Sequence, residues 1–179
     1  MPQLSYSTIG ISICAQKFNK GVINMSLQIG DKAPEFSADD QTGKTHTLED
    51  LTGKTTLIYF YPKDETPGCT MQACSVRDNF EELQAKGIDV IGVSKDDVKS
   101  HQKFVEHHEL PFPVLADTDH KMIESYGAWN EKNMFGKKYF GIVRSSVLVG
   151  PDLKILAVWP KIQPLKTVPE VLKWLEESK

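Results

Sequence analysis

The residues best suited to chemistry in this 179-residue chain are two cysteines, Cys69 and Cys74. Cys69 directly follows Thr66-Pro67-Gly68, a segment typical of the start of a helix. The N-terminus of a helix carries unpaired N–H groups and a partial positive charge, and both stabilise a thiolate. Because a cysteine is an effective nucleophile only as the thiolate, Cys69 is a candidate nucleophile.

The spacing of the two cysteines limits how they can react with each other. Five residues along an α-helix give a net rotation of about 140° and a rise of about 7.5 Å, which separates the Cα atoms by about 8.6 Å. A disulfide requires a Cα separation of no more than about 7 Å. A Cys69–Cys74 disulfide therefore needs the first helical turn to unwind, with Thr66-Pro67-Gly68 as a plausible hinge. The alternative is a pair of ordinary buried cysteines.

The sequence around Cys69 resembles the active-site motif of the peroxiredoxins. The shared pattern is Pro62-x-x-x-Thr66-x-x-Cys69, and Cys74 five positions later is similar to the branch called peroxiredoxin Q or bacterioferritin comigratory protein. A downstream arginine, Arg144, in a strand expected at 143–149, also fits the family. The resemblance covers nearly the whole chain after residue 25.

This resemblance implies a thioredoxin-like fold and a thiol peroxidase that reduces hydrogen peroxide and organic hydroperoxides to water and alcohols. Cys69 would be the peroxidatic cysteine, which becomes a sulfenic acid, and Cys74 the resolving cysteine, which forms a redox-active disulfide with it. Thioredoxin or a glutaredoxin-like protein would then reduce that disulfide. The resemblance further implies a monomer that needs no cofactor.

Three other residues have roles that the resemblance implies, each with a simpler alternative. Thr66 would hold its hydroxyl near the thiolate and the incoming oxygen, whereas a helix cap is an equally common role. Pro62 would cover the thiolate from water, or simply terminate a strand. Arg144 would bind thiolate and peroxide oxygens with its planar guanidinium, or be an ordinary charge at a strand edge. Arg77 is expected to be an exposed ion-pair residue.

Apolar periodicity predicts an α/β fold in which a central mixed β-sheet is flanked by helices. Residues 128–141 have no clear period and are expected to form a loop with exposed lysines. The other expected elements are a hairpin at 36–47, strands at 55–61, 88–93 and 114–116, helices at 68–86, 96–108 and 122–126, a hairpin at 143–159 and a closing helix around 168–175.

Composition excludes several kinds of function. The net charge is −3, from 21 basic and 24 acidic residues without a long basic run, which argues against nucleic acid as a main partner. No apolar stretch approaches the roughly 18 residues that span a bilayer. Three cysteines make a poor disulfide framework, so we expect a soluble protein in the reducing cytoplasm.

Metal binding is not expected from the sequence. His101, His107 and His108 lie on one expected helix amid Glu and Lys residues that indicate a solvent-exposed face. Cys69 and Cys74 lack the spacing of two to four residues that is typical of paired zinc ligands.

The N-terminal region is expected to be separate from the fold. Residues 1–25 are interpreted as a disordered extension before a single domain at 26–179, because Met25-Ser26-Leu27 looks like a natural start. Cys14 would then be incidental. An organellar targeting segment is an alternative, since residues 1–24 contain no acid, although such segments are usually rich in arginine.

Two other functions compete with a thiol peroxidase. A thiol–disulfide oxidoreductase would use similar chemistry, but its usual Cys-x-x-Cys motif is missing. A non-enzymatic holdase is the third possibility, and it would keep its activity when Cys69 is replaced by Ser.

Overall fold

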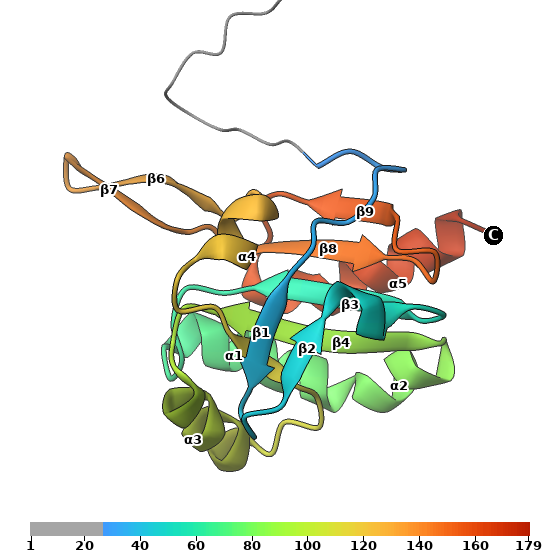
Figure 1. The fold of residues 1–179 in the computed structure, drawn as a ribbon, viewed down its shortest axis with the longest axis horizontal. Coiled ribbons are helices and arrows are strands. Elements are labelled where there is room, and N and C mark those ends of the chain that lie inside the picture. Colours follow the sequence, from blue (N-terminus) through green and yellow to red (C-terminus); the bar gives the residue numbers. More distant parts are fainter. Residues whose placement is uncertain (1–26) are drawn as a thin grey trace, which may run out of the picture.

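A seven-stranded mixed β-sheet forms the centre of the computed structural model, which describes residues 27–179 (Figure 1). The strand order is β2-β1-β5-β4-β3-β8-β9, with β3, β4 and β5 parallel and the remaining neighbours antiparallel. A separate two-stranded sheet contains β6 and β7. The strands are β1 (Ser37–Asp40), β2 (Thr45–Thr47), β3 (Thr55–Phe60), β4 (Ile88–Ser94), β5 (Val114–Ala116), β6 (Trp129–Met134), β7 (Lys137–Ile142), β8 (Ser145–Val149) and β9 (Ile155–Trp159).

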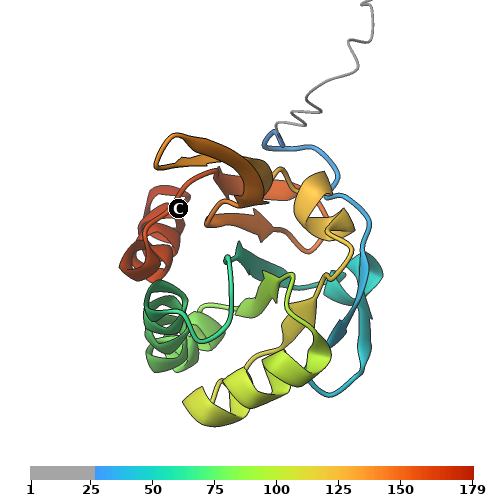
Figure 2. The ribbon, with the colours of Figure 1, turned by 90° about the vertical axis from the view of Figure 1, so that its left-hand side faces the viewer.

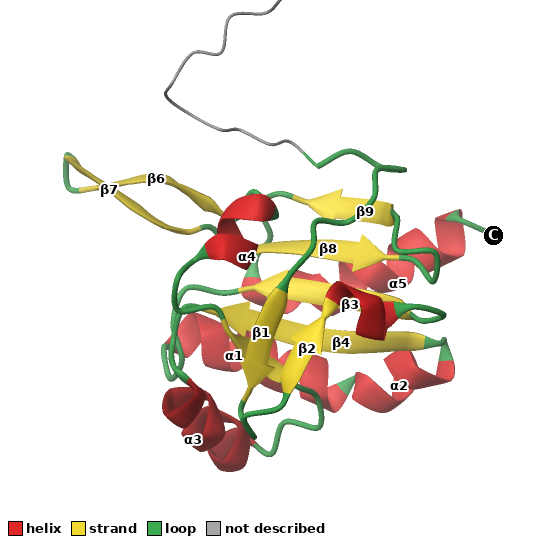
Figure 3. Ribbon diagram, viewed as in Figure 1, coloured by secondary structure: helices red, strands yellow, loops and turns green. Residues whose placement is uncertain are grey.

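Helices cover both faces of the large sheet (Figure 3). Residues of α1, α2, α3 and α5 pack on one face, and residues of η1 and α4 pack on the other. The helices are η1 (Leu48–Leu51), α1 (Pro67–Asp78), α2 (Phe80–Ala85), α3 (Val98–His108), α4 (Lys121–Ser125), η2 (Pro164–Lys166) and α5 (Thr167–Glu177). This arrangement confirms the predicted α/β class.

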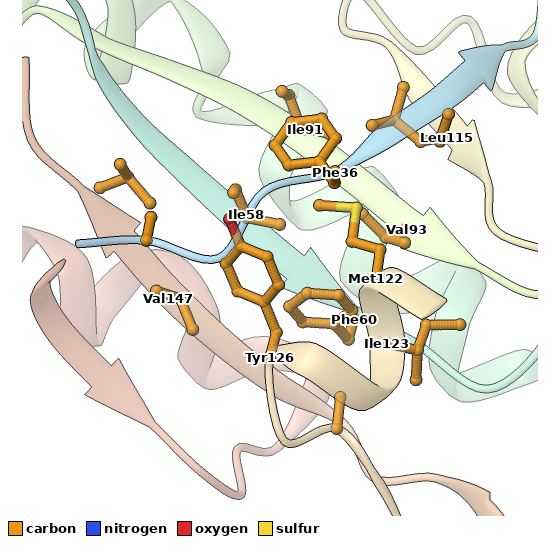
Figure 4. Packing of buried hydrophobic residues seen from close by; sticks show 14 of the residues in the cluster. Phe36, Ile58, Phe60, Ile91, Val93, Leu115, Met122, Ile123, Tyr126 and Val147 are labelled. Atoms are coloured by element: carbon orange, nitrogen blue, oxygen red, sulfur yellow. The ribbon is translucent and has the colours of Figure 1, made fainter. Parts of the chain in front are cut away.

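Alternating side chains of the central strands divide the core into two layers. On β3, Ile58 and Phe60 belong to the cluster beneath α4, whereas Leu57 and Tyr59 belong to the cluster beneath α1 and α5. Successive side chains of a strand point to opposite faces, so a strand covered on both sides is apolar at most of its positions. Figure 4 shows the cluster beneath α4, in which Phe60 packs against Tyr126. Their ring centroids are 5.5 Å apart.

The helix expected at 68–86 is wrong as a single helix, because the structure divides it into α1 and α2. Asn79 separates them, with a non-helical backbone at φ −109° and ψ 11°. Its side-chain amide donates a hydrogen bond to the Ser75 carbonyl at 2.8 Å. Asparagine readily makes such local bonds to the backbone, which compete with helix continuation. The apolar spacing continues across the break and therefore concealed it.

The loop expected at 128–141 is also wrong, because β6 and β7 form a hairpin that extends away from the large sheet (Figure 1). Its turn consists of Phe135 and Gly136, with φ values of 52° and 78°. Two successive left-handed residues make the tight turn that matches strand twist, and Asn or Asp normally occupies the first position. Phenylalanine there gives no turn signal in the sequence.

The other expected elements are confirmed within one or two residues of their predicted ends. Within residues 27–179, no helix is both long and apolar enough to cross a membrane. The expectations for Cys14 and for an extension at 1–25 lie outside the described residues, so the proposed domain boundary stays a prediction.

Candidate active site

Sheet topology brings Arg144 to the loop that leads into the cysteine-bearing helix. Phe60, the last residue of β3, pairs with Ser145, the first residue of the antiparallel strand β8. The chain that leaves β3 and the chain that enters β8 therefore lie at the same edge of the sheet. Arg144 directly precedes β8 rather than lying inside a strand as expected. This position allows its side chain to reach α1.

Cys69 occupies the first turn of α1, as its sequence context predicts. The helix begins at Pro67, so Cys69 is the third helical residue, and its residue surface is only 2% exposed. The first N–H groups of a helix have no carbonyl partner within it. Here they belong to Gly68 and Cys69, since Pro67 has none. No acidic residue lies in this first turn, which leaves the positive end of the helix dipole uncompensated there.

The guanidinium of Arg144 contacts the Cys69 sulfur. Nη2 of Arg144 lies 3.3 Å from Cys69 Sγ as a hydrogen-bond donor, and Nη1 donates to Oε1 of Gln72. Gln72 is fully buried, and its Nε2 donates to Thr167 Oγ1 at 2.8 Å. A chain of hydrogen bonds thus joins α5, α1 and the arginine beside the sulfur. α1 packs against both α5 and α3 (Figure 2).

The motif around Cys69 does not include Gln72 or Thr167. The buried residues of α1 are Cys69, Gln72, Ala73 and Val76, which share one helix face at the spacing i, i+3, i+4 and i+7. A glutamine on a face that is otherwise apolar needs a buried partner. The position of Gln72 on the same helix face as Cys69 is the sequence feature that indicates its burial beside the site.

Gly68 lets the guanidinium approach the helix. A Cβ atom at this position would lie 3.2 Å from Nη2 of Arg144 and 3.6 Å from Cγ of Pro164. The first distance is tighter than ordinary van der Waals contact, so a larger residue would push the guanidinium by a few tenths of an ångström. Gly68 was expected only as part of a hinge, and the structure gives it this additional spatial role.

Thr66 and Pro62 lie in the loop between β3 and α1. Thr66 is the N-cap residue by backbone position, but its hydroxyl donates to the Lys63 carbonyl at 2.8 Å and makes no capping bond. The side-chain cap considered as an alternative is therefore wrong. Since that O–H is already engaged as a donor, the oxygen is left to accept a hydrogen bond. Pro62 is half-buried, and shielding of the thiolate by this residue stays a prediction.

A buried carboxylate anchors the same loop to α3. Asp64 accepts hydrogen bonds from Tyr61 Oη at 2.6 Å and Ser100 Oγ at 2.7 Å, and His101 Nδ1 lies 2.8 Å from its Oδ2. The backbone N–H of Asp64 donates to Asp96 at 2.9 Å. The solvent-exposed position expected for His101 is wrong, because this side chain is fully buried. The sequence shows the Glu and Lys residues near His101, but it does not show that His101 pairs with the buried Asp64.

Asp64→Asn is expected to destabilise the protein in a pH-dependent way. Burial alone would raise the pKa of Asp64, but hydrogen bonds from His101, Tyr61 and Ser100 outweigh it and leave the pKa below its ordinary value. The ionised carboxylate therefore stabilises the fold above the unfolded pKa of about 3.9, and this contribution disappears as the pH falls through the folded pKa. Urea unfolding should show a loss of about 1–3 kcal/mol at pH 7 that shrinks towards pH 3.

The exposed Asp152→Asn is the matched control for that experiment. Its carboxylate pairs with Lys154 Nζ at 3.8 Å and accepts a hydrogen bond from the backbone N–H of Lys154 at 3.2 Å, which an amide oxygen can also accept. We expect it to change the free energy of unfolding by at most about 0.5 kcal/mol at any pH. An Asp64→Asn difference that stays constant from pH 7 to pH 3 would contradict the assigned role of the ionised Asp64.

The β6–β7 hairpin also approaches the site. Burial, followed by the positive charge of Arg144, lowers the pKa of Lys132 on β6. Lys132 is half-buried, unlike the exposed lysines expected in this segment. The segment that sequence periodicity left without structure therefore contributes a second cation to the surroundings of Cys69.

Comparison with known proteins decides the family. Residues 29–158 match the AhpC/TSA family. The chain belongs to this family and is a peroxiredoxin. Peroxiredoxin Bcp of Escherichia coli K12 is 45% identical over 151 residues, which are 84% of this chain and 97% of that protein. A putative peroxiredoxin bcp of Coxiella burnetii is 47% identical over 148 residues, 83% of this chain and 98% of that protein.

Solved peroxiredoxin Q structures share the fold. A cysteine-to-serine mutant from Xylella fastidiosa superposes with a TM-score of 0.80 at 29% identity, covering 86% of this chain and 98% of the other. The bacterioferritin comigratory protein of Xanthomonas campestris gives a TM-score of 0.77 at 30% identity, covering 86% and 98%. The thioredoxin-like fold and the resemblance inferred from the motif are confirmed. As a peroxiredoxin, the protein is a thiol peroxidase with a peroxide substrate and a thioredoxin-type reductant.

Proposed function

We propose that this peroxiredoxin reduces hydroperoxides with Cys69 as the peroxidatic cysteine and Cys74 as the resolving cysteine. The observation that carries the proposal is the 3.3 Å contact between Arg144 Nη2 and Cys69 Sγ at the start of α1. A permanent cation then contacts a sulfur in the first turn of a helix, where the N–H groups of Gly68 and Cys69 have no carbonyl partner within the helix. Such a setting stabilises the thiolate that must attack the peroxide.

In the first step the thiolate of Cys69 attacks the terminal oxygen of the hydroperoxide. A sulfur–oxygen bond forms while the oxygen–oxygen bond breaks, and the leaving oxygen keeps the bonding electron pair. The sulfur is oxidised by two electrons to sulfenic acid, and the leaving oxygen takes a proton from solvent to become water or an alcohol. Arg144 is placed to stabilise the negative charge as it passes from sulfur to oxygen.

Thr66 supplies a complementary contact in this scheme. Because its O–H donates to the Lys63 carbonyl, its oxygen is oriented to accept the O–H of an incoming hydroperoxide. The peroxide then meets an acceptor from the loop and a donor from Arg144. These two contacts favour an in-line approach to the Cys69 sulfur.

In the second step the thiol of Cys74 attacks the Cys69 sulfenic sulfur, which forms a disulfide and releases water. Both cysteines are free in the structure and lie within one intact helix. Helix geometry separates their Cα atoms by about 8.6 Å, so the first turn of α1 must unwind before the bond forms. A dithiol of the thioredoxin or glutaredoxin class then returns two electrons and two protons.

The substrate range and assembly state follow from the same proposal. We propose that both hydrogen peroxide and alkyl hydroperoxides are reduced, since a related solved structure concerns the alkyl peroxide reduction activity of the Xanthomonas campestris protein. We also propose that the chain acts as a monomer, because the cysteines and the arginine of the cycle all lie in one chain.

One equivalent of hydroperoxide is expected to convert the reduced protein to a form lighter by two hydrogens. Trypsin cleaves after Lys63 and Arg77, so Cys69 and Cys74 fall in the single peptide 64–77. An internal disulfide should lower the mass of that one peptide, as measured by mass spectrometry without reduction. A disulfide that instead links this peptide to the peptide containing Cys14 would refute Cys74 as the resolving cysteine.

A further inference from the structure

A cluster of three side chains outside the catalytic contacts has the composition of a metal site. Glu65 lies in the loop before α1, and His107 and His108 end α3. Nδ1 of His107 lies 3.1 Å from Glu65 Oε1, and Nε2 of His108 lies 3.0 Å from Glu65 Oε2. The three potential ligand atoms lie within 4.8 Å of one another.

We propose that Glu65, His107 and His108 bind a divalent transition-metal ion such as Zn²⁺. Two imidazole nitrogens and one carboxylate oxygen are ligands that zinc accepts at about 2.0–2.2 Å. Each histidine nitrogen lies 3.0–3.1 Å from one of the two Glu65 oxygens. At that metal radius a nitrogen and an oxygen so placed subtend about 90° at the ion, as in five- and six-coordinate sites. Rotation of the exposed His107 ring would bring all three side chains onto one ion, and water would complete the coordination. Two nitrogen donors favour zinc, copper or nickel over calcium or magnesium.

The backbone and the ring positions hold these side chains in place. Glu65 adopts a left-handed conformation with φ 57°, which is uncommon for a residue other than glycine. Successive helical residues normally point about 100° apart, yet the rings of His107 and His108 stack with centroids 4.5 Å apart. The ring of His108 also packs edge-on against buried Phe104 at 5.0 Å. His107 is largely exposed, so a metal ion has access from solvent.

Metal binding at this cluster would restrain the catalytic loop. Glu65 directly precedes Thr66, the N-cap of α1, whereas both histidines belong to α3. A bound ion would therefore tie the start of α1 to a separate helix. The consequence rests on the proposed function: if the first turn of α1 must unwind before Cys74 reacts, zinc slows formation of the Cys69–Cys74 disulfide.

Zinc binding to the reduced protein tests the site directly, by competition with a chromophoric chelator. We expect His107→Ala and Glu65→Gln each to weaken zinc affinity at least tenfold. His46→Gln is the matched control, because it removes another histidine paired with a carboxylate, at 2.7 Å from Asp40, and should change affinity less than twofold. Equal affinity in all variants would overturn the proposal.

Cobalt(II) substitution identifies the ligands by their spectrum. A nitrogen and oxygen site gives only weak visible d–d bands, whereas a cysteine ligand adds a strong thiolate-to-cobalt charge-transfer band in the near ultraviolet. We expect the weak bands alone, and we expect them to disappear in His107→Ala. A thiolate band in the wild-type protein would overturn the assignment by placing the metal on a cysteine.

The kinetic consequence is measured by rapid quenching after one equivalent of peroxide, with and without saturating zinc. We expect disulfide formation to slow at least threefold with zinc in the wild-type protein but not in His107→Ala. If zinc binds but the rate of disulfide formation does not change, the proposed restraint of α1 is refuted and the metal site itself is not. Absence of the disulfide even without zinc would instead refute the proposed role of Cys74, so the two failures are distinguishable.

Discussion

Cys69→Ser is expected to abolish peroxide turnover. A serine hydroxyl does not ionise near neutral pH and is a poor nucleophile towards peroxide oxygen, so the contact with Arg144 cannot compensate for the lost thiolate. Turnover should fall to the rate without enzyme, measured as peroxide consumption with a thioredoxin system. The replacement differs by one atom, and the fold should persist because Ser approximates the volume of Cys at this 2% exposed position.

Two other cysteine variants make this test specific. Cys74→Ser should still form one equivalent of sulfenic acid, which dimedone traps, but it should not form the internal disulfide. Cys14→Ser should match the wild type, since no step of the proposed cycle uses that thiol. Peroxide turnover in Cys69→Ser at the wild-type rate would refute the proposed mechanism. Sustained turnover in Cys74→Ser would show that the external dithiol reduces the sulfenic acid directly.

The elements that position the site could be predicted because each has a strong local pattern. In β3, Leu57 to Phe60 form an unbroken hydrophobic run, and Pro67 and Gly68 mark the start of α1. The sequence does not indicate the β6–β7 hairpin, because Phe135 occupies a left-handed turn position that usually holds Asn or Asp. The break at Asn79 was missed because the apolar spacing continues through it.

The reacting cysteine and its arginine were predictable from the sequence, but the buried residues that hold them in place were not. The motif and the downstream arginine predict Cys69 and Arg144 as site residues, and the structure places them in contact. The sequence does not show what Gln72 and Asp64 bond, although the helix face that Gln72 shares with Cys69 indicates that it is buried. Their partners Thr167 and His101 lie 95 and 37 positions away in the chain. Such pairs are set by tertiary packing, which local patterns do not encode.

Replacement of Arg144 is the second change expected to slow the reaction strongly, because its guanidinium contacts the Cys69 sulfur and is bonded to Gln72. Arg144→Gln should slow the reaction of Cys69 with peroxide about 10²–10³-fold, the usual cost of losing a donor that stabilises developing negative charge. Arg144→Lys should recover part of the loss, because it keeps the charge but cannot contact the sulfur and Gln72 together. Stopped-flow measurement of single-turnover oxidation gives the rate, and thermal unfolding shows whether the fold is intact.

Gln72→Leu distinguishes positioning of Arg144 from a general structural effect. This change removes the acceptor of Nη1 and is expected to slow Cys69 oxidation about tenfold, because the guanidinium loses the bond that fixes its orientation. If Gln72 acts only through Arg144, the double variant should react no more slowly than Arg144→Gln alone. Losses that simply add would show that Gln72 acts by another route. The hydrogen bonds from Thr167 through Gln72 would then stabilise α1 without orienting the arginine towards the sulfur.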